Sequence, residues 1–214
     1  MNAAPELLIA TRNAGKVREF ASLLAGAPLR IRGLEEFPQT TEVEETGRTF
    51  AENASLKARV YSAQTGLWTL ADDSGLEVEA LGGAPGIFSA RYGGPHATTD
   101  AERTARLLSE LAQTKDDARR ARFVCVIALA RPHADAPELF TGECTGRIAH
   151  APRGMNGFGY DPVFMPDGYE QTFGELSSEI KHDLSHRARA LRGALAFIFR
   201  QLEEARLDPP PPAR

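Results

Sequence analysis

The sequence has few cysteines and no long apolar segment. Only two cysteines, Cys125 and Cys144, occur among 214 residues, so the chain cannot carry a disulfide framework. The longest apolar run, residues 123–130, is far shorter than the roughly 20 residues that a membrane-spanning helix needs. The N-terminus lacks the basic stretch that begins a signal peptide. These absences predict a reduced, cytoplasmic protein that does not enter a membrane.

A surplus of positive charge is also missing. Lys and Arg number 25 against 29 Asp and Glu, which gives a formal net charge of -4 at pH 7. Proteins that bind nucleic acids or anionic membranes non-specifically need the opposite balance. We therefore expect neither partner, and we expect basic residues gathered in a pocket to serve a local ligand.

Apolar runs that predict strands are spread along the chain. The short run 6–10 and the longer runs 123–130 and 139–148 have the composition of buried or half-buried strands. The last two form a predicted hairpin, which, if symmetric, places the two cysteines opposite each other as small core residues. Length and composition predict one domain over residues 1–207, and a proline-rich disordered tail over 208–214.

Polar capping patterns predict where helices begin. Thr49 with Glu52, and Thr99 with Glu102, have the spacing of a capping box. Ser185 is the expected N-cap of a long C-terminal helix. Helices alternating with strands predict an α/β fold.

Two adjacent carboxylates, Asp72 and Asp73, close the apolar run that opens at Trp68, and Ser74 and Gly75 follow them. Asp, Ser and Gly are ordinary turn residues, so this segment alone favours a strand that ends in a turn. Carboxylates in a cleft of low dielectric need a cation or take up a proton. If the turn lies in a cleft, a divalent metal is the expected ligand.

A candidate phosphate cradle lies between the first strand and the first helix. The segment 11–16, Thr-Arg-Asn-Ala-Gly-Lys, leads into a helix N-terminus, where free N–H groups and the helix dipole attract anions. The Walker A pattern is absent, so a P-loop NTPase is excluded. Many strand-to-helix turns have these residues for turn chemistry alone. The buried face predicted for the helix consists of Val17, Phe20, Ala21 and Leu24.

Residues 153–162 are too rich in glycine for regular structure, and they place Phe158 and Tyr160 beside Asp161. An aromatic ring in a glycine frame can stack on a base, with the acid free to accept its donors. A wide turn whose aromatic rings fill the core is an equal alternative.

A cluster of donors precedes the last helix. Lys181, His186 and Arg187 lie at or near its N-terminus, where the helix dipole disfavours cations. Residues placed against this preference often bind an anion, although an isolated His-Arg pair is ordinarily exposed to solvent.

Taken together, these segments resemble the inosine triphosphate pyrophosphatase family, whose members hydrolyse deaminated or otherwise non-standard purine nucleoside triphosphates. Arg12 and His182 depart from the residues that the family commonly has at these positions. The matching segments follow the order and spacing of the family, and they are residues 11–16, 45–54, 71–76, 82–92, 157–162 and 185–187.

The resemblance implies an elongated mixed β-sheet flanked by helices, with two lobes around a central nucleotide cleft, and a homodimer. It also implies attack of water on the α-phosphate of ITP, dITP or XTP with Mg²⁺, which releases the nucleoside monophosphate and pyrophosphate. Two alternatives stay open, namely a related nucleotide pyrophosphatase with another base preference and a nucleotide-binding module that does not hydrolyse.

Carried over position by position, the resemblance implies that Asp73 is the general base, that Glu45 and Asp73 bind the metal, and that Asp72 supports Asp73. It implies that Phe158 stacks on the purine while Asp161, His186 and Arg187 read its edge, with Gly159 and Tyr160 in the same substrate-binding segment. The residues implied to hold phosphates are Thr11, Arg12, Asn13, Ala14, Gly15, Lys16, Ser74 and Lys181.

Overall fold

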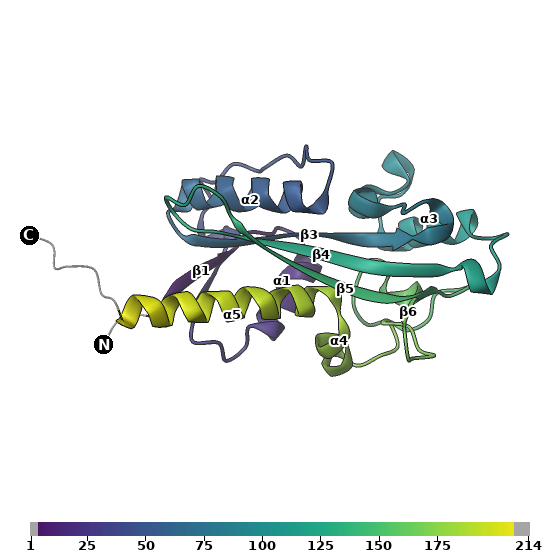
Figure 1. The fold of residues 1–214 in the computed structure, drawn as a ribbon. Coiled ribbons are helices and arrows are strands. Elements are labelled where there is room, and N and C mark those ends of the chain that lie inside the picture. The colour runs from purple at the N-terminus through teal and green to yellow at the C-terminus, as the bar shows by residue number, and fades with distance from the viewer. Residues whose placement is uncertain (1–3, 208–214) are drawn as a thin grey trace, which may run out of the picture.

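The computed structural model describes residues 4–207, and the tail predicted to be disordered at 208–214 lies outside them. A six-stranded mixed sheet in the order β2-β1-β3-β4-β5-β6 forms its centre, with helices on both faces (Figure 1). The predicted α/β fold with a mixed sheet is confirmed. No helix within residues 4–207 is long and apolar enough to cross a membrane.

The sheet has a short parallel part and a long antiparallel part. β1 pairs in parallel with β2 and β3. The pairs β3–β4, β4–β5 and β5–β6 are antiparallel. The three long strands run along most of the molecule (Figure 1). The strands are β1 (Glu6–Ile9), β2 (Arg30–Gly33), β3 (Trp68–Val78), β4 (Arg120–Ala130), β5 (Glu138–Ile148) and β6 (Phe164–Pro166).

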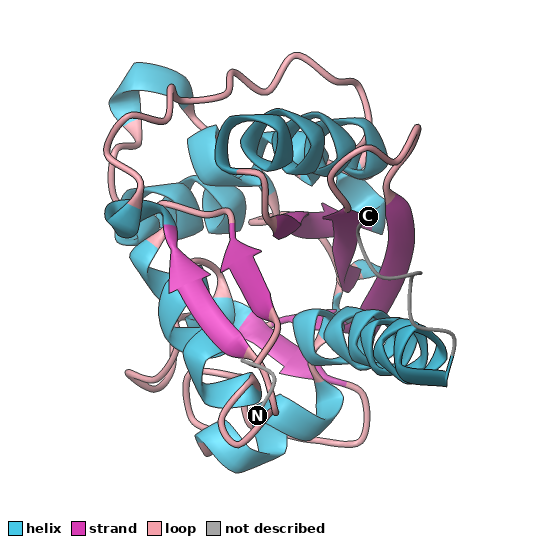
Figure 2. Ribbon diagram, turned by 90° about the vertical axis from the view of Figure 1, so that its left-hand side faces the viewer, coloured by secondary structure: helices cyan, strands magenta, loops and turns pink. Residues whose placement is uncertain are grey.

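Helices cover both faces of the sheet. α2 lies on one face, and α1 and α5 pack on the other (Figures 1 and 2). α3 packs at the far end of the long strands, and α4 leads directly into α5. The helices are α1 (Ala14–Leu23), α2 (Phe50–Thr65), α3 (Asp100–Glu110), α4 (Ser178–Leu184) and α5 (His186–Leu207).

The predicted helix starts are confirmed. Thr49 Oγ1 accepts a hydrogen bond from the Glu52 amide at 3.1 Å, and Thr99 Oγ1 accepts one from the Glu102 amide at 3.2 Å. Ser185 Oγ accepts one from the Ala188 amide at 3.2 Å, which satisfies a free N–H in the first turn of α5.

The expectation that a turn follows the Asp pair is wrong. Every residue of β3 from Thr69 to Val78 pairs with β4, so Asp72 and Asp73 lie inside a continuous strand. The pairing with β4 outweighs the local turn preference of these residues, because strand propensity depends strongly on tertiary context. Successive side chains of a strand point to opposite faces, so the two carboxylates diverge.

The cysteine prediction is confirmed in part. Cys125 and Cys144 are free and buried, as expected of small core residues. They are not opposite each other, because the β4–β5 hairpin pairs Phe123 with Cys144 and Cys125 with Gly142.

Candidate active site

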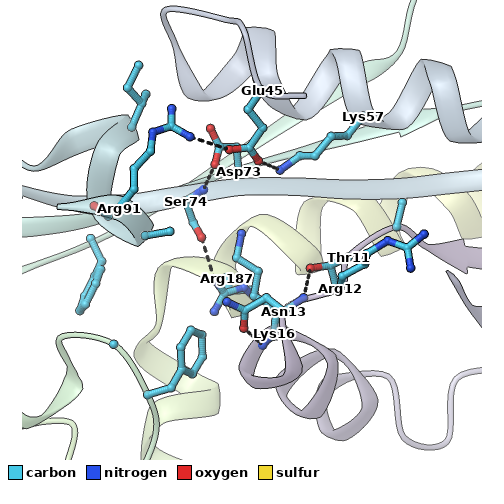
Figure 3. A pocket seen from close by; sticks show the side chains of 18 of the residues that line it. Thr11, Arg12, Asn13, Lys16, Glu45, Lys57, Asp73, Ser74, Arg91 and Arg187 are labelled. Atoms are coloured by element: carbon cyan, nitrogen blue, oxygen red, sulfur yellow. Dashed lines mark hydrogen bonds and ion pairs between the residues drawn. The ribbon is translucent and has the colours of Figure 1, made fainter. Parts of the chain in front are cut away.

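A cleft of about 710 Å³ opens between α2 and β3 on one side and α1, α4, α5 and residues 158–161 on the other. Figure 3 shows side chains from both walls pointing into this space. Fourteen of the sixteen predicted site residues line the cleft, and Ala14 and Gly15 do not. Segments separated by more than 150 residues in sequence therefore meet at one place.

Asp73 points toward the α2 face of the sheet, into a largely buried position with 5% of its surface exposed. Asn53 Nδ2 donates a hydrogen bond to Asp73 Oδ2 at 3.0 Å, and the Ser74 amide donates one to Oδ1 at 3.0 Å. Burial raises the pKa of Asp73, Glu45 adds to this rise, and Lys57 and Asn53 offset only part of it. The carboxylate is thus a stronger base than an exposed aspartate.

Glu45 lies next to Asp73 in the cleft and is held by two cations (Figure 3). Lys57 Nζ lies 2.5 Å from Glu45 Oε1, and Arg91 Nη1 lies 3.8 Å from Oε2. Burial alone would lower the pKa of Lys57, but Asp72, Asp73 and Glu45 together raise it, so this ammonium stays charged. Lys57 was not predicted from the sequence, where its only signal is its position next to the apolar stripe of α2.

Asp72 points to the opposite face, toward α1 and α5, and is almost completely buried. Lys16 Nζ lies 2.9 Å from its Oδ2, and Arg187 approaches the same oxygen through Nε and Nη2 at 3.4 Å. Ser74 Oγ donates a hydrogen bond to it at 3.1 Å and accepts one from Arg187 Nη2 at 2.8 Å. Asp72 therefore orders cations and does not support Asp73, which corrects the expectation for this residue.

The ion pairs continue from Arg187 across the cleft wall. Arg187 Nη1 donates to Glu19 Oε2, and Lys181 Nζ lies 2.5 Å from both Glu19 Oε1 and Asp161 Oδ2. Cations and anions alternate, so the set is neutral when all members are charged. We call these residues the ionic network: Lys16, Asp72, Arg187, Glu19, Lys181 and Asp161.

Glu19 is a member that sequence reasoning missed. It lies one helical turn after Lys16, on the face of α1 that meets α4 and α5. Burial would raise its pKa, but Arg187 and Lys181 together lower it, so Glu19 is ionised. The i, i+3 spacing from Lys16 is the one feature of the sequence that pointed to it.

Phe158 and Tyr160 have different environments. The Phe158 ring lines the cleft, with Lys181 Nζ 5.3 Å from its centroid. A Cβ atom at Gly15 would lie 2.6 Å from the ring, so only glycine allows α1 to approach it so closely. Tyr160 is buried in the core, and its hydroxyl donates to the Ser89 carbonyl at 3.0 Å. Of the two interpretations of this segment, the core-filling one describes Tyr160, and Phe158 is the ring available for stacking.

His186 and Arg187 lie at the buried end of the cleft. The His186 ring stacks on Phe123 with centroids 4.7 Å apart, and no described group pairs with its Nδ1. Burial, with Arg187 and Lys181, lowers the pKa of His186 well below its usual value, so the imidazole is neutral. The guanidinium of Arg187 has partners for every nitrogen, which leaves one N–H of Nη1 unused among the residues that the structure describes.

The start of α1 is partly capped by its own side chains. Asn13 Oδ1 accepts a hydrogen bond from the Lys16 amide at 3.1 Å, and Thr11 Oγ1 accepts one from the Asn13 amide at 3.3 Å. Two amides of the predicted cradle are thus already paired. Lys16 and Arg12, which both line the cleft, are the groups that add positive charge to this end of it.

Charges in the cleft are nearly balanced, with seven Lys or Arg and six Asp or Glu among the lining residues. A polyphosphate in such a cleft needs an additional cation. Within residues 4–207 no three His, Cys, Asp or Glu side chains cluster in a way that could hold a metal by themselves. Mg²⁺ typically uses one or two carboxylates, with waters and phosphate oxygens as its other ligands. The pair Glu45 and Asp73 fits that donor set.

A sequence model of the Ham1 family matches residues 7–197. A protein of Symbiobacterium thermophilum named dITP/XTP pyrophosphatase is 51% identical over 199 residues, which cover 92% of this chain and 97% of that protein. A protein of the same name from Gloeobacter violaceus is 50% identical over 194 residues, covering 91% of this chain and 94% of that protein.

Solved structures show the same similarity. The HAM1 protein from Coxiella burnetii matches with a TM-score of 0.82 and 43% identity, over 92% of this chain and 99% of that chain. The Staphylococcus aureus Ham1 protein matches with a TM-score of 0.80 and 40% identity, over the same fractions.

Proposed function

Because the chain belongs to the Ham1 family, as its motifs predicted, we propose that it hydrolyses non-standard purine nucleoside triphosphates such as dITP, ITP and XTP. The products are the nucleoside monophosphate and pyrophosphate. The observation that carries the proposal is the meeting of fourteen predicted site residues in one cleft of about 710 Å³. This volume lies within the range of about 300 to 1,000 Å³ typical of small-ligand sites.

In this proposal Asp73 is the general base. It takes a proton from the water whose oxygen attacks the α-phosphorus, while the bond from this phosphorus to the oxygen that bridges to the β-phosphate breaks. The raised pKa of Asp73 supports the role, because a base is most effective when its pKa approaches the working pH. Asn53 and the Ser74 amide fix the orientation of the carboxylate.

The oxygens of Glu45 and Asp73 are the groups that would bind Mg²⁺. When bound, the ion polarises the attacked phosphoryl group and offsets the charge of the phosphates. Lys16 and Arg12 hold the phosphates from the α1 side of the cleft, and Lys57 does so from the α2 side.

The purine base of the substrate binds at the end of the cleft that contains Phe158, His186 and Arg187. The unused N–H of Arg187 is a donor, which suits the acceptor O6 of hypoxanthine or xanthine and opposes the amino group of adenine. The free Nδ1 of the neutral His186 provides a second polar atom there. Two mismatched buried groups cost about 2 to 6 kcal/mol, which corresponds to roughly 30-fold to 10⁴-fold discrimination against ATP.

Product analysis by ³¹P NMR tests the proposal. We expect dITP and ITP incubated with the protein and Mg²⁺ to give the monophosphate and pyrophosphate, and ATP to react much more slowly. A matched sample with EDTA measures the metal requirement. Orthophosphate with a nucleoside diphosphate would contradict the cleavage position, and tight dITP binding without turnover would indicate a binding module.

The homodimer is proposed from the family resemblance alone. Light scattering at micromolar concentration should give twice the chain mass of 23.2 kDa. A monomer mass would remove this part of the proposal.

A further inference from the structure

Asp100, the first residue of α3, contacts the segment that carries Phe158. Its Oδ2 accepts a hydrogen bond from the Gly159 amide at 2.7 Å, although the two residues are 59 positions apart. Its Oδ1 accepts a hydrogen bond from Arg103 Nη2 at 2.6 Å, which orients the carboxylate. Asp100 and Arg103 both line the cleft, yet neither has a role in the reaction described above.

The backbone around Phe158 has little stiffness of its own. Gly157 and Gly159 flank it, with φ values of 77° and 62°. Glycine adopts this conformation without steric cost and has wide conformational freedom. The position of Phe158 therefore depends on the groups that bind the amides of the segment.

Two carboxylates bind these amides from different directions. Asp161 Oδ2 accepts a hydrogen bond from the Phe158 amide at 2.8 Å, and it belongs to the same loop. Asp100 binds the next amide from α3, an element that packs at the other end of the sheet from α1. Asp161 is itself paired with Lys181 of α4, and Thr104 of α3 donates a long hydrogen bond to the Gly159 carbonyl at 3.5 Å. Asp100 adds a charged acceptor from α3 that binds the Gly159 amide directly.

The position of the Phe158 ring decides the shape of the cleft. The ring stands between the main cleft and a second cavity of about 480 Å³, and both Phe158 and Lys181 line the two spaces. The ring packs closely against Gly15 of α1 on the side of the second cavity, which Gly15 also lines. A shift of the segment would move the ring, and with it the surface on which a purine stacks in the proposed function.

We propose that Asp100 is a positioning residue, which latches the Phe158 segment in the conformation that stacks on the purine. This inference rests on the proposed function. Asp100 acts on affinity for the nucleoside half of the substrate, and the chemistry at the α-phosphorus proceeds without it. When the latch is lost, the binding-competent fraction of the protein falls and the apparent affinity falls in proportion.

The kinetic test compares Asp100→Ala with Asp100→Asn, because asparagine keeps an oxygen acceptor and alanine has none. We expect Asp100→Ala to raise the KM for dITP about threefold to tenfold, as loss of one hydrogen bond to a half-exposed acceptor would. The kcat changes by less than about twofold, and Asp100→Asn restores most of the affinity. Asp117→Ala, a change of another exposed acid outside the cleft, is the matched control.

Inhibition by pyrophosphate distinguishes a loss of affinity for the nucleoside half of the substrate from a general defect of the whole binding site. Pyrophosphate occupies only the phosphate half of the site, so its inhibition constant should be the same in Asp100→Ala and the wild type. A parallel rise of this constant and of the KM would overturn the proposal. An unchanged KM for dITP would overturn it too.

A fluorescence measurement tests the latch without turnover. Trp68 is the single tryptophan, so Phe158→Trp in a Trp68→Phe background gives a reporter at the latch. Adding Asp100→Ala should increase acrylamide quenching of this reporter, and adding Asp117→Ala should not. Unchanged quenching would overturn the latch. If quenching rises but dITP is not hydrolysed by the wild type, the latch stands and the proposed function fails.

Discussion

Asp72 and Asp73 are neighbours in β3, and their environments push their pKa values in opposite directions. Burial would raise the pKa of Asp72, but Lys16, Arg187 and Lys57 together lower it far below its usual range. Burial also raises the pKa of Asp73, and there the nearby Lys57 and Asn53 do not compensate. Both carboxylates are almost completely buried, so the difference comes from the cations on each face of the sheet.

The comparison shows how one strand gives two neighbouring carboxylates different roles. Asp72 is a permanent anion that holds Lys16 and Arg187 in place, and Asp73 is a basic carboxylate that can accept a proton. Pairs of titratable groups whose environments drive their pKa values apart are typical of acid–base sites. Strand alternation alone creates the separation, because it turns adjacent side chains to opposite faces.

The largest expected effect is on kcat, and it comes from removing the proposed general base, Asp73. Asp73→Asn keeps the shape of the side chain, and its one amide oxygen can accept from Asn53, but the substitution removes the proton acceptor, the negative charge and the oxygen that faces the Ser74 amide. Loss of general-base catalysis lowers kcat by about 10² to 10⁴-fold. Steady-state turnover of dITP measures it, with the binding of dITP to the variant confirming an intact site. Turnover near that of the wild type would remove Asp73 from the reaction.

The same substitution at the neighbouring position should act on stability. Asp72→Asn leaves Lys16 and Arg187 buried without their shared anion. Breaking a buried ion pair by removing one partner costs about 3 to 5 kcal/mol. Urea unfolding at pH 7 measures the loss, with Asp73→Asn as the matched control. Equal stability of the two variants would show that the ionic network contributes little to folding.

Part of this site was predictable from the sequence. Motif order identified the residues that meet in the cleft, and capping patterns located the starts of α2, α3 and α5. The capping patterns depend only on residues a few positions apart, so they predict helix starts without knowledge of the tertiary fold. The turn expected after Asp73 was wrong, because a local preference gave way to ten successive pairings between β3 and β4.

The ionic network was less predictable, since apolar periodicity does not mark a face buried through ion pairs. Val17 and Ala21 were expected on the buried face of α1 but are exposed, Val17 by 41%, whereas Phe20 and Leu24 are buried as predicted. Glu19, a charged residue, lies on the protected side because Arg187 and Lys181 neutralise it. These partners are more than 160 residues away in sequence, so only the fold brings them together.

The smallest expected effect is a difference in the pH dependence of stability between the two aspartates, measured in EDTA so that no metal binds. The raised pKa of Asp73 means that the folded state binds its proton more tightly than the unfolded state. The contribution of Asp73 to wild-type stability therefore falls as the pH rises from the unfolded pKa of about 3.9 through the folded value. Asn does not titrate, so Asp73→Asn should gain stability relative to the wild type between acid and neutral pH.

The contribution of Asp72 to stability changes with pH in the opposite direction. Its depressed pKa means that its contribution is fully present above the unfolded value and is lost as the pH falls through the folded value. The stability deficit of Asp72→Asn should therefore be largest at pH 7 and shrink in acid. Urea unfolding of wild type and both variants at about pH 2.5, pH 4 and pH 7 measures these differences, the lower interval for Asp72 and the upper interval for Asp73, and pH-independent changes in hydrogen bonding cancel in the comparison. If both variants show the same trend with pH, the two faces of β3 do not have opposite electrostatics.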